Sequence, residues 1–126
     1  MPHFIVEYTD NLKQEGDIKA FLQKVNEYMM SRGDVFPTGG IRSRAIELHD
    51  YVIADGQEDD AFVHATLKLG KGRSEEVKKL VCEELFSLMK EHFAGLFDKR
   101  YLALSMELME FAHGTYKHNN IHKRFK

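Results

Sequence analysis

The chain has 126 residues, of which 43% are hydrophobic and 30% charged. This length predicts a single domain over 1–126, and the composition is that of an ordinary globular protein. A net charge of −2 argues against nucleic-acid and membrane-surface partners, which both require a basic excess. No apolar run approaches the ~20 residues of a membrane span, and no secretory leader opens the chain. Because the lone Cys82 has no partner for a disulfide, a cytoplasmic location is predicted.

The first half of the chain predicts a strand, a helix and a second strand. Apolar and polar residues alternate over 3–8, which is typical of a half-buried strand. Apolar residues then recur at helical spacing over 18–29, with Asp17 as the expected N-cap. A second extended segment is predicted from Ile41 to about Ile53, and a turn signal follows at 55–56.

The second half repeats this order. Alternation predicts strands over 61–69 and 101–111, and an apolar stripe predicts a helix over 77–92. Cys82 lies within that helix, where we interpret it as a small apolar side chain rather than a nucleophile. The pattern therefore predicts an α/β fold, a two-layer α+β sandwich in which two βαβ units of about 1–56 and 57–126 form a four-stranded mixed sheet. Both helices are expected on one face, and the other face carries enough apolar residues to predict cover by further subunits.

Pro2 is the first candidate for chemistry. Removal of Met1 would leave Pro2 with a free secondary amine, whereas proline nitrogen within a chain has neither a proton nor basicity. Burial beside an apolar strand would lower the pKa of that amine towards neutrality, where a general base works best. The alternative is that Pro2 only permits processing and starts an edge strand.

Two arginines follow a pair of glycines at the start of the second extended segment. Because side chains of a strand alternate, Arg42 and Arg44 are expected on the same face. An arginine fork binds a carboxylate through two parallel hydrogen bonds. The alternative is a solvated pair that protects the edge of a sheet.

A third arginine lies where the third strand is expected to pass into the second helix. Ser74 is the predicted N-cap there, and glycines before a helix N-terminus favour an anion site that Arg73 would reinforce. The full glycine–lysine pattern of a phosphate-binding P-loop is absent. The alternative is an ordinary capped helix start with loop cations.

The histidines do not predict a metal site. Only His118 and His122 have helical metal spacing, and no third ligand lies near them in the sequence. His64 is expected to line a pocket or an interface. The polar tail from Lys117 to Lys126 is expected to dock its few apolar residues onto a neighbouring subunit.

Together these features resemble the tautomerase superfamily, whose members use an amino-terminal proline as a catalytic base. Within it, the chain is most similar to the family of 5-carboxymethyl-2-hydroxymuconate Δ-isomerases. The matching blocks run almost from end to end, and they are Pro2 to Glu7, Phe36-Pro37, Gly40 to Arg44, Ala54 to Gln57, Ala61 to His64, Thr66 to Lys68, Gly72 to Ser74, His92 to Ala94, Leu102 to Ser105, Asn119 to His122, and Phe125-Lys126.

The resemblance implies a homotrimer that moves a proton in the degradation of homoprotocatechuate, turning a dienol into the conjugated ketone without a metal or organic cofactor. It implies that Pro2 is the base and that Arg42 and Arg73 bind a substrate with three carboxylates. Arg44 is a further candidate for the substrate or for an intersubunit contact. Two alternatives remain open: another reaction of the superfamily, such as decarboxylation or dehalogenation, and a non-catalytic trimeric ligand-binding protein, which retention of Met1 would support.

Overall fold

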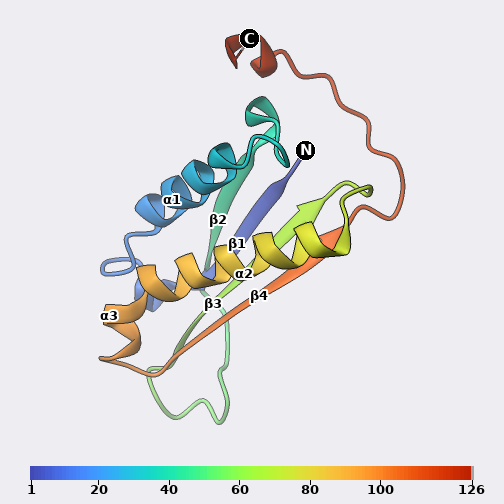
Figure 1. The fold of residues 1–126 in the computed structure, drawn as a ribbon. Coiled ribbons are helices and arrows are strands. Elements are labelled where there is room, and N and C mark those ends of the chain that lie inside the picture. Colours follow the sequence, from blue (N-terminus) through green and yellow to red (C-terminus); the bar gives the residue numbers. More distant parts are fainter. Residues whose placement is uncertain (126) are drawn as a thin grey trace.

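A computed structural model describes residues 1–125 of the chain. Four strands form one sheet, two long helices pack on it, and short helical turns lie between them (Figure 1). In chain order the elements are β1 (His3–Thr9), η1 (Asp10–Leu12), α1 (Ile18–Ser31), η2 (Thr38–Gly40), β2 (Arg42–Leu48), β3 (Ala61–Leu69), α2 (Glu75–His92), α3 (Ala94–Phe97), β4 (Leu102–Glu110) and η3 (Ile121–Phe125).

The sheet is mixed, with the strand order β2-β1-β3-β4. β1 runs parallel to β2, β3 runs parallel to β4, and the two pairs meet where β1 lies antiparallel to β3. Each parallel pair is joined through a helix, α1 in the first and α2 in the second, and Figure 1 shows both helices on the same face of the sheet. The predicted fold class is confirmed. The division near residue 56 stays a prediction, and it falls in the loop between β2 and β3.

The core lies between the sheet and the two helices. Alternate residues of the central strands, Phe4 and Val6 among them, are fully buried, as are Phe21 of α1 and Leu85 of α2. The ring of Phe21 contacts that of Phe4 edge-on, with centroids 6.0 Å apart, and that of Phe93 at 5.1 Å. The period-two and helical patterns of the sequence therefore converge on one apolar layer.

One predicted strand is too long. The sequence suggested an extended segment to about Ile53, but β2 ends at Leu48. Leu48 pairs with Thr9, the last residue of β1, so the chain beyond it has no parallel partner to bond with. Tyr51 instead bonds to the turn after β1, where its hydroxyl donates to Asp10 Oδ1 at 2.7 Å. Apolar alternation alone could not reveal where the partner strand ends.

The two helix starts differ from one another. At α2 the predicted cap is confirmed, because Ser74 Oγ accepts a hydrogen bond from the Val77 amide at 3.2 Å. At α1, Asp17 occupies the N-cap position but makes no side-chain capping bond. Its backbone is left-handed (φ 46°, ψ 56°), whereas a capping side chain reaches the first-turn amides from an extended backbone. The predicted position of the cap is therefore confirmed, but the predicted capping bond from the Asp17 side chain is wrong.

The C-terminal tail returns to the beginning of the chain. Residues 112–118 are exposed, and η3 then packs against η2 close to the N-terminus (Figure 1). The tail thus contacts its own chain through η3 and η2, and docking of its apolar residues onto a neighbouring subunit stays a prediction. None of the helices within residues 1–125 has the length and apolar character needed to cross a membrane.

Candidate functional site

The predicted site residues gather at the end of the sheet where β1 begins. Pro2 is buried directly before β1, and its carbonyl oxygen accepts a hydrogen bond from the Arg42 amide at 3.1 Å. Because β3 runs antiparallel to β1, its last residues lie at the same end, with Lys68 opposite His3. The loop from β3 to α2 brings Arg73 there as well. Because β1 pairs parallel with β2 and antiparallel with β3, residues that lie far apart in the sequence meet at this end of the sheet.

The N-terminal amine lies among cations. Burial lowers the pKa of the Met1 ammonium below its ordinary value of 8.0, and the charges of Lys117, Arg73 and Arg42 lower it further. Burial also lowers the pKa of His3, with additional contributions from Arg44 and Arg42. Each of these charges disfavours a further proton. The surroundings of the chain terminus therefore favour a neutral amine. In the structure that amine belongs to Met1, and the Pro2 nitrogen is an amide.

Arg42 and Arg44 lie on the same face of β2, as predicted, opposite the face covered by the helices. Arg42 makes one long side-chain bond, from Nη1 to the Gly40 carbonyl at 3.3 Å. Arg44 Nη1 lies 3.0 Å from Nδ1 of His3. Because a guanidinium can only donate, this ring nitrogen accepts, and the imidazole is neutral with its proton on Nε2. Arg42 is thus held loosely and close to Pro2, while Arg44 has a local partner.

Arg73 is held by backbone oxygens. Its Nη2 donates to the Val35 carbonyl at 2.8 Å, Nη1 donates to the Gly70 carbonyl at 3.2 Å, and the guanidinium carbon lies 5.5 Å from the centroid of the Phe36 ring. Neutral carbonyls orient a guanidinium but leave its charge uncompensated. The geometry therefore leaves Arg73 with a fixed direction and a full positive charge.

Sequence reasoning named neither Lys68, near the end of β3, nor Lys117 of the C-terminal tail as a site residue. Among the nearby charges, that of Lys117 lowers the pKa of the N-terminal amine most, although Lys117 lies far beyond Arg73 in the sequence. The tail brings it there, since Asn119 Nδ2 donates to the Gly39 carbonyl in η2 at 2.9 Å. No periodicity links the polar tail to the strands. The available signals were the apolar residues of the tail, which could dock it, and the match of Asn119 to His122 with the family.

These five cations, which we call the N-terminal cation cluster, are Arg42, Arg44, Lys68, Arg73 and Lys117. Within residues 1–125 no carboxylate lies in ion-pair distance of any of them. A protein with a net charge of −2 has acidic residues enough to neutralise such a cluster. Uncompensated cations around a weakly basic amine can bind and orient an anion with several carboxylates.

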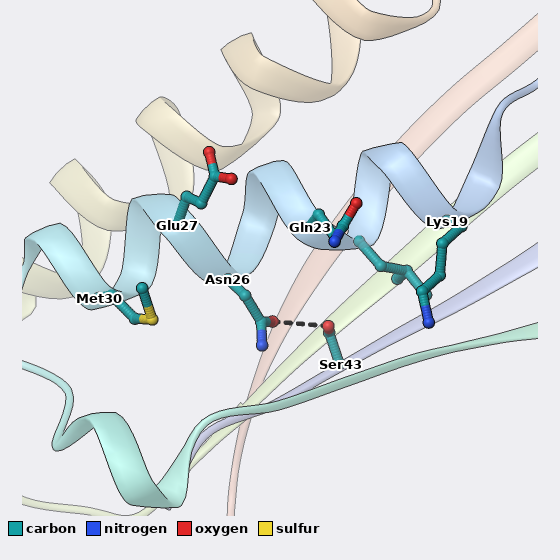
Figure 2. Close-up of a pocket in the computed structure, with 7 residues that line it drawn as sticks. Lys19, Gln23, Asn26, Glu27, Met30 and Ser43 are labelled. Atoms are coloured by element: carbon teal, nitrogen blue, oxygen red, sulfur yellow. Dashed lines mark hydrogen bonds between the residues drawn. The ribbon is translucent and has the colours of Figure 1, made fainter. Parts of the chain in front are cut away.

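Two hollows in the surface are lined by residues other than the five cations. The one drawn in Figure 2, of about 400 Å³, lies between α1 and β2, and its lining includes Lys19 and Glu27. Ser43 Oγ donates to Asn26 Oδ1 within it at 2.6 Å, from the opposite face of β2 to Arg42. A hollow of about 310 Å³ beside the cation cluster is lined by Gly70, Lys71 and residues 111–115. In the described part of the chain, no three His, Cys, Asp or Glu side chains gather as a metal site.

The comparisons with known proteins agree along the whole chain. The family model described as 5-carboxymethyl-2-hydroxymuconate isomerase matches residues 2–125. The "5-carboxymethyl-2-hydroxymuconate Delta-isomerase" of Escherichia coli is 48% identical over 128 residues, covering 100% of both chains. A crystal structure of a 5-carboxymethyl-2-hydroxymuconate isomerase from Deinococcus radiodurans R1 is 51% identical, with a TM-score of 0.94 over 99% of this chain and 94% of that one. A fused 4-OT symmetric trimer, 15% identical over 93% of each chain with a TM-score of 0.65, shares the fold alone.

Proposed function

This chain belongs to the 5-carboxymethyl-2-hydroxymuconate isomerase family, and from that membership we propose that it converts 5-carboxymethyl-2-hydroxymuconate to its conjugated 2-oxo isomer. It is an enzyme, an isomerase that shifts a carbon–carbon double bond. The observation that carries the substrate proposal is the N-terminal cation cluster. Its charges act on the Met1 amine or on His3, and within residues 1–125 none of its members has a carboxylate in ion-pair distance. A substrate with three carboxylates supplies the charge that the cluster lacks.

Pro2 is the proposed base. Once Met1 is removed, the secondary amine of Pro2 takes the proton from the 2-hydroxyl group of the dienol. The C2–O bond becomes a carbonyl, the double bonds shift along the carbon chain, and the protonated amine returns the proton to carbon. Protons and electrons balance in this sequence, so it requires neither a metal nor an organic cofactor. The burial and positive charge that lower the pKa of the Met1 amine would act similarly one residue further on, keeping Pro2 neutral and able to accept a proton.

Arg42 and Arg73 are the proposed carboxylate ligands. One would hold the 2-hydroxy acid end and draw electron density towards the developing oxyanion, and the other would clamp a distal carboxylate. The support is their position at the chain terminus and the absence of ion pairs for them within residues 1–125. Arg44, bonded to His3, is proposed as a secondary ligand or as an intersubunit contact.

We expect the enzyme to be a cytoplasmic homotrimer acting in homoprotocatechuate catabolism. The support is physical: the sheet face opposite the helices bears apolar residues such as Ile46 and Met109, each 46% exposed. Apolar surface of this kind is usually covered by other chains. A symmetric assembly would also close the side of the cation cluster that this chain leaves open.

The test is an isomerase assay on protein of known N-terminal mass. Protein lacking Met1 should convert 5-carboxymethyl-2-hydroxymuconate, followed by its ultraviolet spectrum, and Pro2→Ala should lower kcat by about 10²- to 10⁴-fold, as expected for loss of a positioned acid–base group. Urea unfolding of both proteins checks that the variant is folded. Protein that lacks Met1 and shows no conversion would favour another reaction of the superfamily or simple ligand binding. Protein that retains Met1 should be inactive until the methionine is removed.

A further inference from the structure

We propose that Lys117, delivered by the C-terminal tail, binds one of the three substrate carboxylates and thereby selects a tricarboxylate over a dicarboxylate. This inference rests on the proposed function and deepens it. Lys117 lies in the C-terminal tail, outside the sheet and the long helices. A hydrogen bond to η2, the turn before Arg42, holds that tail in place.

The anchor is Asn119. Its Nδ2 donates to the Gly39 carbonyl at 2.9 Å, and its Oδ1 accepts from the Ile121 amide at 2.8 Å. The first bond ties the tail to η2, and the second starts the helical turn η3. One half-buried amide side chain therefore uses its donor to fix the position of the tail and its acceptor to shape it.

The contact between the tail and η2 is close enough to require glycine. A Cβ atom added to Gly39 would lie 2.6 Å from His122 Nδ1 and 2.8 Å from its Cα. A Cβ atom added to Gly40 would lie 3.6 Å from the Cα of Met1 and 3.8 Å from His122 Cε1. The same turn thus touches the tail on one side and the N-terminus on the other. This packing places the tail beside the candidate catalytic amine.

Lys117 precedes the anchor by two residues, so its backbone lies within about 7 Å of Asn119. From there its charge reaches the N-terminal amine, whose pKa it lowers more than Arg73 or Arg42 does. No carboxylate within residues 1–125 forms an ion pair with it. An exposed ammonium tethered at the rim of the site can meet a carboxylate that the two arginines have not bound.

The charge balance makes the assignment specific. 5-Carboxymethyl-2-hydroxymuconate carries three carboxylates, of which Arg42 and Arg73 are proposed to bind two. The dicarboxylate 2-hydroxymuconate lacks the carboxymethyl arm, so if Arg42 and Arg73 bind its two carboxylates, no carboxylate is left for Lys117. If Lys117 binds that arm, neutralising it must weaken the tricarboxylate and spare the dicarboxylate, since only the first has a group for it to contact.

The experiment compares KM for the two substrates, or the inhibition constant of 2-hydroxymuconate if that compound only binds. Both are measured above the acid limb of the pH profile, where the amine is neutral in the wild type and in the variant. Lys117→Met should raise the value for the tricarboxylate by about tenfold, the loss of one charged hydrogen bond, and change that for the dicarboxylate by less than about twofold. Lys117→Arg should restore most of the loss. Lys123→Met, which removes the same charge from an exposed position further along the tail, should leave both values unchanged.

The anchor is tested by Asn119→Asp, which keeps the acceptor for Ile121 but turns an oxygen towards the Gly39 carbonyl. It should raise KM for the tricarboxylate as Lys117→Met does, and the double variant should add little. Asn120→Asp introduces the same charge on the adjacent exposed residue and should have no such effect. Equal changes for both substrates in Lys117→Met would overturn the inference while leaving the isomerase proposal intact. A wild-type protein lacking Met1 that converts neither compound would defeat both.

Discussion

At the end of the sheet where β1 finishes, Arg100 donates through Nη2 to Asp59 Oδ2 at 3.1 Å and to the Asp59 carbonyl at 2.7 Å. Asp10 there receives hydrogen bonds from both Tyr51 and His49. At the end where β1 begins, the acceptors of Arg73 within residues 1–125 are the carbonyls of Val35 and Gly70 alone. Within residues 1–125, the charge of Arg100 is compensated by a carboxylate, whereas that of Arg73 is not.

The difference separates structural cations from binding cations. A buried or half-buried charge that meets a carboxylate of its own chain contributes to folding and has little left for a ligand. A cation held by neutral oxygens keeps its charge, at a cost that a bound anion can offset. The two ends therefore distinguish the candidate site by charge compensation rather than by the size of any hollow, and substitutions at each end should have opposite effects on activity and stability.

The largest effect is expected from Arg42→Met. If Arg42 holds a carboxylate in the transition state, kcat/KM should fall by about 10²-fold, the size expected for one charged contact that is lost. Unfolding free energy should change little, because the side chain makes a single 3.3 Å bond in its own chain. Steady-state kinetics and urea unfolding measure the two quantities. Arg44→Met, on the same strand face but one row further from Pro2, serves as the control and should lose less activity.

Arg100→Met should show the reverse pattern. The variant leaves the carbonyls of Asn11 and Asp59 without their donor, which should lower the free energy of unfolding by about 2 kcal/mol. Activity of the remaining folded protein should stay near that of the wild type, since the site lies at the other end of the sheet. A large loss of kcat/KM in fully folded protein would mean that Arg100 also affects the site and that the two ends are coupled.

The smallest effect concerns pH. Activity that requires a neutral Pro2 amine should rise with pH through the pKa of that amine. Burial and the nearby cations lower the pKa of the Met1 amine below its ordinary value of 8.0, and the same surroundings are expected to lower the pKa of Pro2 once Met1 is removed. Salt screens those cations, so the acid limb of kcat/KM should move to higher pH at high ionic strength. Lys117→Met should move it in the same direction. Lys79→Met, which removes an exposed lysine paired with Glu83 on α2, should not, and an equal shift in that variant would exclude a local effect.

Much of the fold follows from local patterns. Period two marked β1, β3 and β4 to within a residue or so, and the apolar stripes marked both long helices, because each pattern records which side of an element faces the core. Predictions that depended on a partner were weaker. The segment after Leu48 alternates like a strand, yet it has no neighbour to pair with once β1 ends at Thr9. Asp17 has the right residue type for a cap, but its backbone is left-handed and its side chain makes no capping hydrogen bond.

By itself the sequence determined the strand–helix–strand repeat, the residue types that could handle a proton and an anion, and the resemblance to a family. Tertiary structure alone decided which of the cations stand together and which have acidic partners. It also added Lys117, which no spacing links to Arg42 or Arg73. The physical reason is that charge compensation depends on distances across strands and along a returning tail, and those distances exist only after the elements have packed.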